Sequence, residues 1–210
     1  MNYPETVNII DLAPAPFNCA KDAIIYAKSH GIVGVMSNAD TNGKGEVSIS
    51  VLSIRKMMNQ SALRKSVTPA LHYAALVRLR DIIRESFIAE IHQDRMKRNG
   101  KRSADFGTNP EVAILRLYGC VSFGDLPFRS KVTLKAYTDG NEKTKAYSYE
   151  ITNVEVLKGN AGAVPLPSNK TSTFDVGILL NGVLDVNGVP LLYPNPDFFG
   201  IIYPGFPRDP

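Results

Sequence analysis

One continuous stretch, from Gly31 to the helix that carries His72, constrains the fold of this 210-residue chain most strongly. Two β-branched, partly alternating segments, residues 32–37 and 46–51, flank Asn42-Gly43, a dipeptide favoured in hairpin turns. Helical patterns follow the second segment directly. The sequence therefore predicts a β-hairpin followed by helices.

The helices after the hairpin have recognisable starts. Ser53 can cap a short helix from Ile54 to about Asn59. Thr68-Pro69 then suits the start of the longest helix, because proline fits the first helical position, and this helix is expected to run to about Arg95. At helical spacing, one broad apolar face forms from Leu71, Ala75, Leu76, Leu79, Ile82, Ile83 and Phe87, with His72 inside it.

Three strands are expected next, at about residues 111–123, 129–137 and 145–157. In the second strand, Val132, Leu134 and Ala136 alternate with Lys131, Thr133, Lys135 and Tyr137. In the third strand, Tyr147, Tyr149 and Ile151 alternate with Ser148, Glu150 and Thr152. The predicted fold class is α+β: helices followed by an antiparallel β-sheet, with an extra N-terminal β-hairpin.

Composition along the chain suggests three parts. Residues 1–17, with three prolines, are expected to be an extended lead-in, and residues 18–158 an α+β domain whose first helix runs from Asn18 to about His30. Residues 159–210 are expected to be a Pro-rich accessory tail, irregular except for short strands near 174–180 and 183–186. This tail keeps Phe198, Phe199, Ile201 and Ile202, which would pack on the domain or on a protein partner.

Charge and composition limit the kinds of partner that this protein is expected to have. The net charge is +4; residues 160–210 carry two basic and four acidic side chains, which leaves +6 for residues 1–159. A basic body permits an RNA partner without requiring one. No apolar run approaches the length of a membrane helix, and the first residues lack a signal-peptide pattern, so no membrane partner and a cytoplasmic location are expected.

Cofactor signals are absent from the sequence. The three histidines and the two cysteines, Cys19 and Cys120, match no metal-ligand spacing, and no nucleotide-binding glycine loop occurs. We therefore expect neither a metal nor another cofactor.

Three groups of residues are candidates for function, each with an alternative. His72 is either a buried, backbone-bonded histidine or a general acid or base. The basic loop containing Arg98, Lys101 and Arg102 is either a solvated loop or a phosphate contact. The set Arg116, Lys131, Thr133 and Glu150 shares a sheet face if the strands pair in sequence order. Such a face is either the wet side of an antiparallel sheet or a surface for an RNA backbone.

A family resemblance rests on these same segments. Gly31-Ile-Val-Gly-Val-Met-Ser, the Asn-Gly turn, Ser48-Ile-Ser-Val-Leu-Ser-Ile, Lys65-Ser66 and the His72 helix resemble the large polyvalent protein-associated domain of phages and mobile elements. The segments Ile114-Leu-Arg116-Leu-Tyr and Lys131-Val-Thr-Leu-Lys135 add to it. The resemblance covers roughly residues 20–158. That domain is similar to the barnase–EndoU–RelE-like nuclease fold.

The resemblance implies a metal-independent RNA-cleaving or RNA-binding module of a prophage or mobile element. His72 would act as acid or base, Arg116 and Lys131 would stabilise phosphate, and Ser66 and Thr133 would position the substrate. Leu115 stands where family members often carry a second histidine. Two readings therefore stay open: an endoribonuclease, or a non-catalytic structural or protein-interaction protein that retains a degenerate nuclease-like fold.

Overall fold

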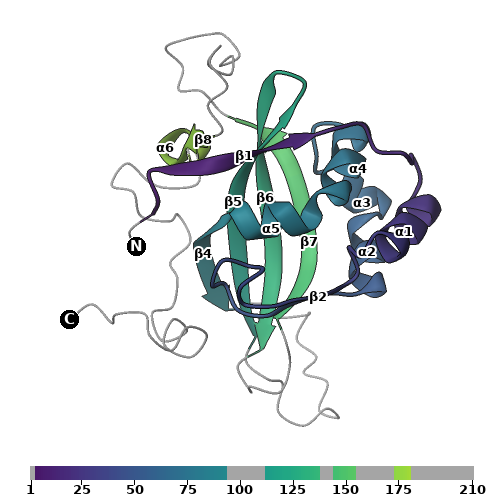
Figure 1. Cartoon of the computed structure of the whole chain (residues 1–210), viewed down its shortest axis with the longest axis horizontal. Helices are drawn as coiled ribbons and strands as arrows, with labels where there is room; N and C mark the ends of the chain where they lie inside the picture. Colours follow the sequence, from purple (N-terminus) through teal and green to yellow (C-terminus); the bar gives the residue numbers. More distant parts are fainter. Residues whose placement is uncertain (1–2, 94–111, 138–143, 155–172, 181–210) are drawn as a thin grey trace, which may run out of the picture.

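The computed structural model describes residues 3–93, 112–137, 144–154 and 173–180 (Figure 1). In this part of the chain, a mixed β-sheet is combined with several short helices. The strands are β1 (Thr6–Leu12), β2 (Gly34–Met36), β3 (Val47–Ile49), β4 (Phe87–Gln93), β5 (Val112–Phe123), β6 (Leu126–Tyr137), β7 (Thr144–Asn153) and β8 (Thr173–Asp175). The helices are α1 (Ala20–Ser29), α2 (Val51–Met57), α3 (Gln60–Leu63), α4 (Pro69–Val77), α5 (Leu79–Glu85) and α6 (Val176–Leu179).

The sheet has the strand order β2-β3-β7-β6-β5-β1-β8, with β4 also beside β5. Strands β4, β5, β6 and β7 pair antiparallel, but β1 pairs parallel with β5, and β3 pairs parallel with β7. The prediction of an antiparallel sheet is therefore wrong, and the fold is mixed α/β. Parallel neighbours need a long crossover, and here helices α1 to α5 lie between β1 and β5.

Strand β1 comes from the segment predicted to be an extended lead-in. It belongs to the sheet, because it pairs with β5 and its side chains Val7, Ile10 and Leu12 are buried. At the other end of the described chain, β8 pairs with β1, and α6 follows where a strand was expected to continue to residue 180. The second strand predicted in the tail, near 183–186, lies outside the described residues.

Several local predictions are confirmed. Strands β2 and β3 form the predicted hairpin, and Asn42 and Gly43 have the positive φ angles, 52° and 81°, that this turn requires. The Thr68 side chain caps α4 by accepting a hydrogen bond from the Leu71 N–H at 3.1 Å, with Pro69 in the first helical position. Helix α2 begins earlier than predicted, because Ser50 rather than Ser53 is its capping residue.

The predicted long helix is wrong beyond Val77. The chain leaves helical geometry at Arg78, continues as the short helix α5, and becomes extended at Ser86. The following residues form β4, which pairs with β5 through a bulge between Ile88 and Glu90. Phe87 therefore does not extend the helical apolar face; it packs beside Tyr3 on the opposite side of the sheet.

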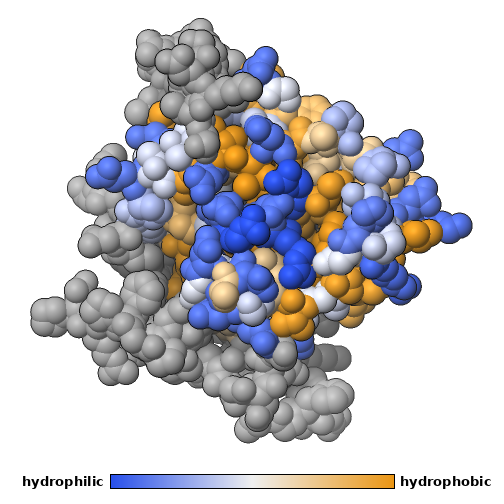
Figure 2. Space-filling view, viewed as in Figure 1, coloured by the Kyte–Doolittle hydropathy of each residue, from blue (hydrophilic) through white to orange (hydrophobic). Residues whose placement is uncertain are grey.

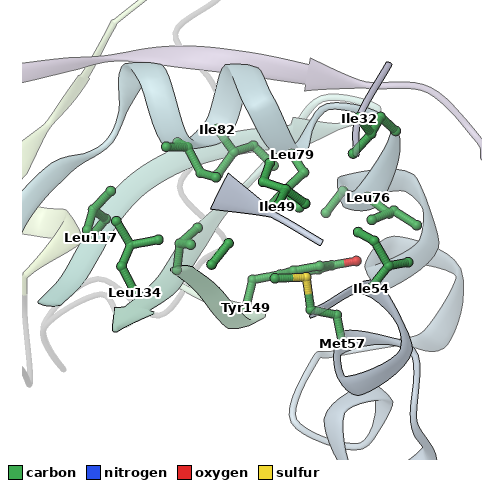
Figure 3. Packing of buried hydrophobic residues seen from close by; sticks show 14 of the residues in the cluster. Ile32, Ile49, Ile54, Met57, Leu76, Leu79, Ile82, Leu117, Leu134 and Tyr149 are labelled. Atoms are coloured by element: carbon green, nitrogen blue, oxygen red, sulfur yellow. The ribbon is translucent and has the colours of Figure 1, made fainter. Parts of the chain in front are cut away.

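The main core lies between the helices and one face of the sheet, which we call the inner face (Figures 1 and 3). It includes Tyr149 and Ile151 of β7, with Val132 and Leu134 of β6, as their alternation predicts. The outer face has a smaller apolar cluster where β1, β8 and α6 lie: Val7, Ala89, Tyr118, Cys120, Phe174, Val176, Leu179 and Leu180. Beyond that cluster, the outward side chains of β6 are polar and half-buried.

Gly119 of β5 provides a test of this packing. A Cβ atom there would overlap Ser86 Oγ and would lie 3.1 Å from Ser130 Oγ. We expect Gly119→Ala to lower the free energy of unfolding by about 1–3 kcal/mol, the usual cost of overpacking. Urea denaturation measures this change.

A second substitution in the same chain serves as the control. The Ser86 hydroxyl is buried without a hydrogen-bond partner among the described residues, so Ser86→Ala should cost little. In the double variant it should restore most of the stability lost in Gly119→Ala. Equal stability of Gly119→Ala and wild type would contradict the packing described here.

Candidate functional site

The structure divides the predicted site residues between the two faces of the sheet. Ser66 and His72 lie with the helices on the inner face, against Tyr149 and Ile151. Arg116, Lys131, Thr133 and Glu150 alternate with the core residues of their strands and so lie on the outer face. The structure thus separates His72 from Arg116 and Lys131. Arg98, Lys101 and Arg102 of the basic loop lie outside the described residues.

His72, in the first turn of α4, is fully buried and uses both ring nitrogens. Its Nδ1 lies 2.7 Å from Ser66 Oγ, and its Nε2 lies 2.9 Å from the carbonyl oxygen of Met57. The ring stacks on Tyr149 with 4.2 Å between centroids. The Tyr149 hydroxyl in turn donates to the His72 carbonyl oxygen at 2.7 Å.

The partners of this histidine assign its tautomer. The Ile151 N–H donates to Ser66 Oγ at 2.9 Å, so the Ser66 hydroxyl can donate to Nδ1. The Met57 carbonyl can only accept, so Nε2 carries the proton. A neutral His72 satisfies every hydrogen bond in this series. We call the series the His72 network; its members are Met57, Ser66, His72, Tyr149 and Ile151.

Burial lowers the pKa of His72 to about 4. The hydrogen bond to Met57 raises this pKa, but its effect is smaller. The ring is therefore neutral near pH 7, sealed from solvent, and committed to neighbours at both nitrogens. The buried, hydrogen-bonded histidine is the interpretation that this geometry favours. The network joins α2, the segment before α4, and strand β7.

On the outer face, Arg116 pairs with Glu90, a residue that the sequence analysis did not identify as a candidate. Its Nη1 donates to Glu90 Oε2 at 2.8 Å, and the Tyr118 hydroxyl donates to Glu90 Oε1 at 2.6 Å. Burial and the bond to Glu90 raise the pKa of Tyr118. Glu90 was missed because β4 was predicted to be helical, and the bulge between Ile88 and Glu90 breaks the alternation that would otherwise have indicated its face.

A second ion pair, Lys131 with Glu150, lies beside the first. Lys131 is opposite Glu150 in β7 and Tyr118 in β5, while Thr133 is opposite Ser148 and Arg116. The predicted sharing of one face is therefore confirmed by the strand register. We call this set the outer-face cluster: Glu90, Arg116, Tyr118, Lys131, Thr133, Ser148 and Glu150.

Strand β6 extends the positive charge of the cluster in both directions. Arg129 and Lys135 occupy the same face as Lys131, and alternate residues of a strand are about 7 Å apart. Arg129 donates to Thr152 Oγ1 at 3.2 Å and to the Leu179 carbonyl at 3.4 Å. The result is a row of cations bordered by hydroxyl groups, a combination suited to the backbone of a polyanion.

The helix-covered side of the molecule carries a different charged surface, the hydrophilic patch over α5 (Figure 2). Here Asp81 is shared by Arg78 and Arg84 at 2.7 and 2.6 Å, and Arg84 also pairs with Glu85. Arg80 donates to the carbonyls of Gly31 and Val35. These contacts hold α5 against the segment containing β2, so this patch has a structural explanation.

Two further observations concern metal binding and membrane crossing. Within residues 3–93, 112–137, 144–154 and 173–180, no group of three or more His, Cys, Asp or Glu side chains is placed to hold a metal ion. Among the helices of the same ranges, none has the length and apolar character needed to cross a bilayer.

The His72 network predicts a dependence of stability on pH. The folded-state pKa of about 4 lies below the ordinary histidine value of 6.5, so the unfolded chain binds a proton first as the pH falls. The contribution of neutral His72 to the free energy of unfolding is fully present above pH 6.5, and it is lost as the pH falls toward 4. Between about pH 7.5 and about pH 5, we expect this group to cost about 2 kcal/mol of unfolding free energy.

Urea denaturation at the two pH values measures this loss. His72→Gln should unfold more easily than wild type at pH about 7.5, yet show a much smaller loss on acidification. His30→Gln, which removes an exposed histidine in α1's C-cap, is the matched control and should keep the wild-type pH dependence. An unchanged pH dependence in His72→Gln would contradict the assignment.

Comparison with known proteins gives no relative from which a role could be transferred. Searches of protein-family models, curated proteins and solved structures each found no match for this chain. The function of the outer-face cluster must therefore be inferred from its own chemistry.

Proposed function

We propose that this protein binds RNA, and that the half-buried members of the outer-face cluster and the neighbouring cations of β6 contact the sugar–phosphate backbone. The main support is the register, which aligns Arg116 and Lys131 with the hydroxyls of Thr133 and Ser148 on one side of the sheet. Cations and hydroxyls are the usual partners of phosphate and ribose. The resemblance to polyvalent-protein domains of phages and mobile elements supports the same proposal.

The ion pairs of the free protein are compatible with such binding. Arg116 uses Nη1 for Glu90 and has further N–H donors, with 29% of its side chain exposed. Lys131 pairs with Glu150, and its side chain is 26% exposed. A phosphate would share or displace these carboxylates, so we expect modest affinity that falls steeply with salt.

RNA cleavage is a second candidate for the same face, favoured by the contact between Lys131 and Glu150. A carboxylate can accept the proton of a ribose 2′-hydroxyl, whose oxygen attacks the adjacent phosphorus while the bond to the 5′ oxygen breaks and that oxygen takes a proton from water. A neighbouring cation stabilises the added negative charge. Tyr118 would be a poor proton donor for the leaving oxygen, because its hydroxyl is bonded to Glu90 and its pKa is raised.

The alternative is a non-catalytic structural or protein-interaction protein that retains a nuclease-like fold. The His72 network favours an absence of histidine chemistry, because both ring nitrogens are occupied and the ring is buried. RNA binding without cleavage reconciles that observation with the basic outer face. A protein partner for the tail, residues 159–210, concerns a segment of which only 173–180 is described.

Binding of a labelled, mixed-sequence RNA of about 20 nucleotides tests the proposal. Fluorescence anisotropy at about 50 and about 200 mM salt should show a large loss of affinity at the higher concentration. Lys131→Ala should weaken binding several-fold and reduce the salt slope by about 0.7, the value for one lost contact to a single strand. Lys28→Ala, in the exposed last turn of α1, should bind as wild type does.

The same preparation decides between binding and cleavage. Incubation with RNA in EDTA, followed by analysis of the ends, should leave the RNA intact if the protein only binds. Products with 2′,3′-cyclic phosphate ends that disappear in Glu150→Gln would instead assign cleavage to this face. Failure of folded wild type to bind RNA at low salt would overturn the proposed function.

A further inference from the structure

A bulge in β7 turns one aromatic side chain away from the core. Thr133 pairs with Ser148, but the next residue of β6, Leu134, pairs with Ala146, so Tyr147 is an extra residue without a partner. Regular alternation predicted that Tyr147 shares the buried side with Tyr149. Instead Ala146 is buried in its place and Tyr147 is 36% exposed, whereas Tyr149 is 2% exposed. Bulges commonly redirect a side chain next to a functional surface.

Two lysines from separate elements converge on the exposed ring. Lys135 Nζ of β6 lies 4.6 Å from the centroid of Tyr147, and Lys56 Nζ of α2 lies 5.1 Å from it. Lys145 of β7 stands opposite Lys135 in the register. The local surface therefore combines one aromatic ring with three lysines drawn from a helix and two strands.

Stability alone is a weak explanation for this arrangement. The bulge interrupts the ladder and exposes a large apolar ring. Attraction between each ammonium and the ring offsets only part of this at an exposed site. An aromatic ring among cations is instead the combination that proteins use to stack a nucleic-acid base and hold its flanking phosphates.

The position of Tyr147 continues the surface already assigned to RNA. Lys135 lies on the same face of β6 as Lys131, four residues further along, a separation of about 14 Å. From Lys135 the surface passes to Tyr147 and then to Lys56 at the edge of the helical layer. One extended strand could contact the outer-face cluster and this ring together.

We propose that Tyr147 stacks an unpaired RNA base, with Lys56 and Lys135 contacting the flanking phosphates, so that the protein selects single-stranded RNA. This inference rests on the proposed function and names its substrate class. In a double helix the bases are paired and stacked on each other, so none can reach Tyr147. The outer-face cluster contacts the backbone of either form, whereas Tyr147 recognises only the unpaired one.

Binding of one RNA of about 12 nucleotides, single-stranded and annealed to its complement, tests the selection. A 2-aminopurine base in the RNA reports stacking through its fluorescence. We expect the wild type to bind the single strand more tightly than the duplex. Tyr147→Leu should bind the single strand about tenfold more weakly and give no stacking signal, while its affinity for the duplex stays unchanged. Tyr147→Phe keeps the ring and should bind as wild type does.

Other variants make the outcomes distinguishable. Lys56→Ala should weaken single-strand binding several-fold, and it serves as the second test if Tyr147→Leu is less folded by circular dichroism. Lys131→Ala should weaken both RNA forms. Single-strand binding that survives both Tyr147→Leu and Lys56→Ala, or that falls equally with duplex binding, would overturn the inference and leave the proposed function standing. Absence of any salt-dependent RNA binding by wild type would overturn both.

Discussion

The attachment of the helical layer to β7 depends on the His72 network. Ser66 accepts the Ile151 N–H, and the Val67 N–H donates to the Ile151 carbonyl at 2.9 Å, so this segment satisfies backbone groups of β7 that have no strand partner there. His72 then links the same serine to the end of α2. Loss of either side chain leaves buried polar groups unpaired, at a cost of about 1–3 kcal/mol for each group.

The pleat of the sheet places core side chains on one face and charged side chains on the other. Inward residues of β5, β6 and β7 form the core, and the outward ones carry the ion pairs and the basic row. Bulges modify this alternation at two places, Glu90 in β4 and Tyr147 in β7. Tyr147 belongs to the proposed RNA surface, and the buried Glu90 holds Arg116 beside it, so that surface depends on local departures from regular strand geometry.

Patterns within one element were readable from the sequence, whereas the direction of pairing between elements was not. The alternation of Lys131 to Ala136 and the Thr68-Pro69 start identified a strand face and a helix start. Residues 6–12 were predicted only to be extended, because a short alternating segment between prolines carries no information about its neighbour. His72 was placed on the correct apolar face, but its hydrogen-bond partners, Ser66 and Met57, lie outside its own helix and needed the tertiary structure. Glu90 was hidden because its segment also fits helical spacing.

The parallel pairing of β1 with β5 has a consequence for synthesis and folding. Asp11 and Ser122, side by side in the sheet, are 111 residues apart in the chain. Strand β1 leaves the ribosome long before β5 and must therefore wait, with its apolar side chains unpaired, until most of the described domain has been made. Such distant contacts slow folding. Pro4 and Glu5 before β1, and Asp11 within it, would limit its association with other strands during that interval.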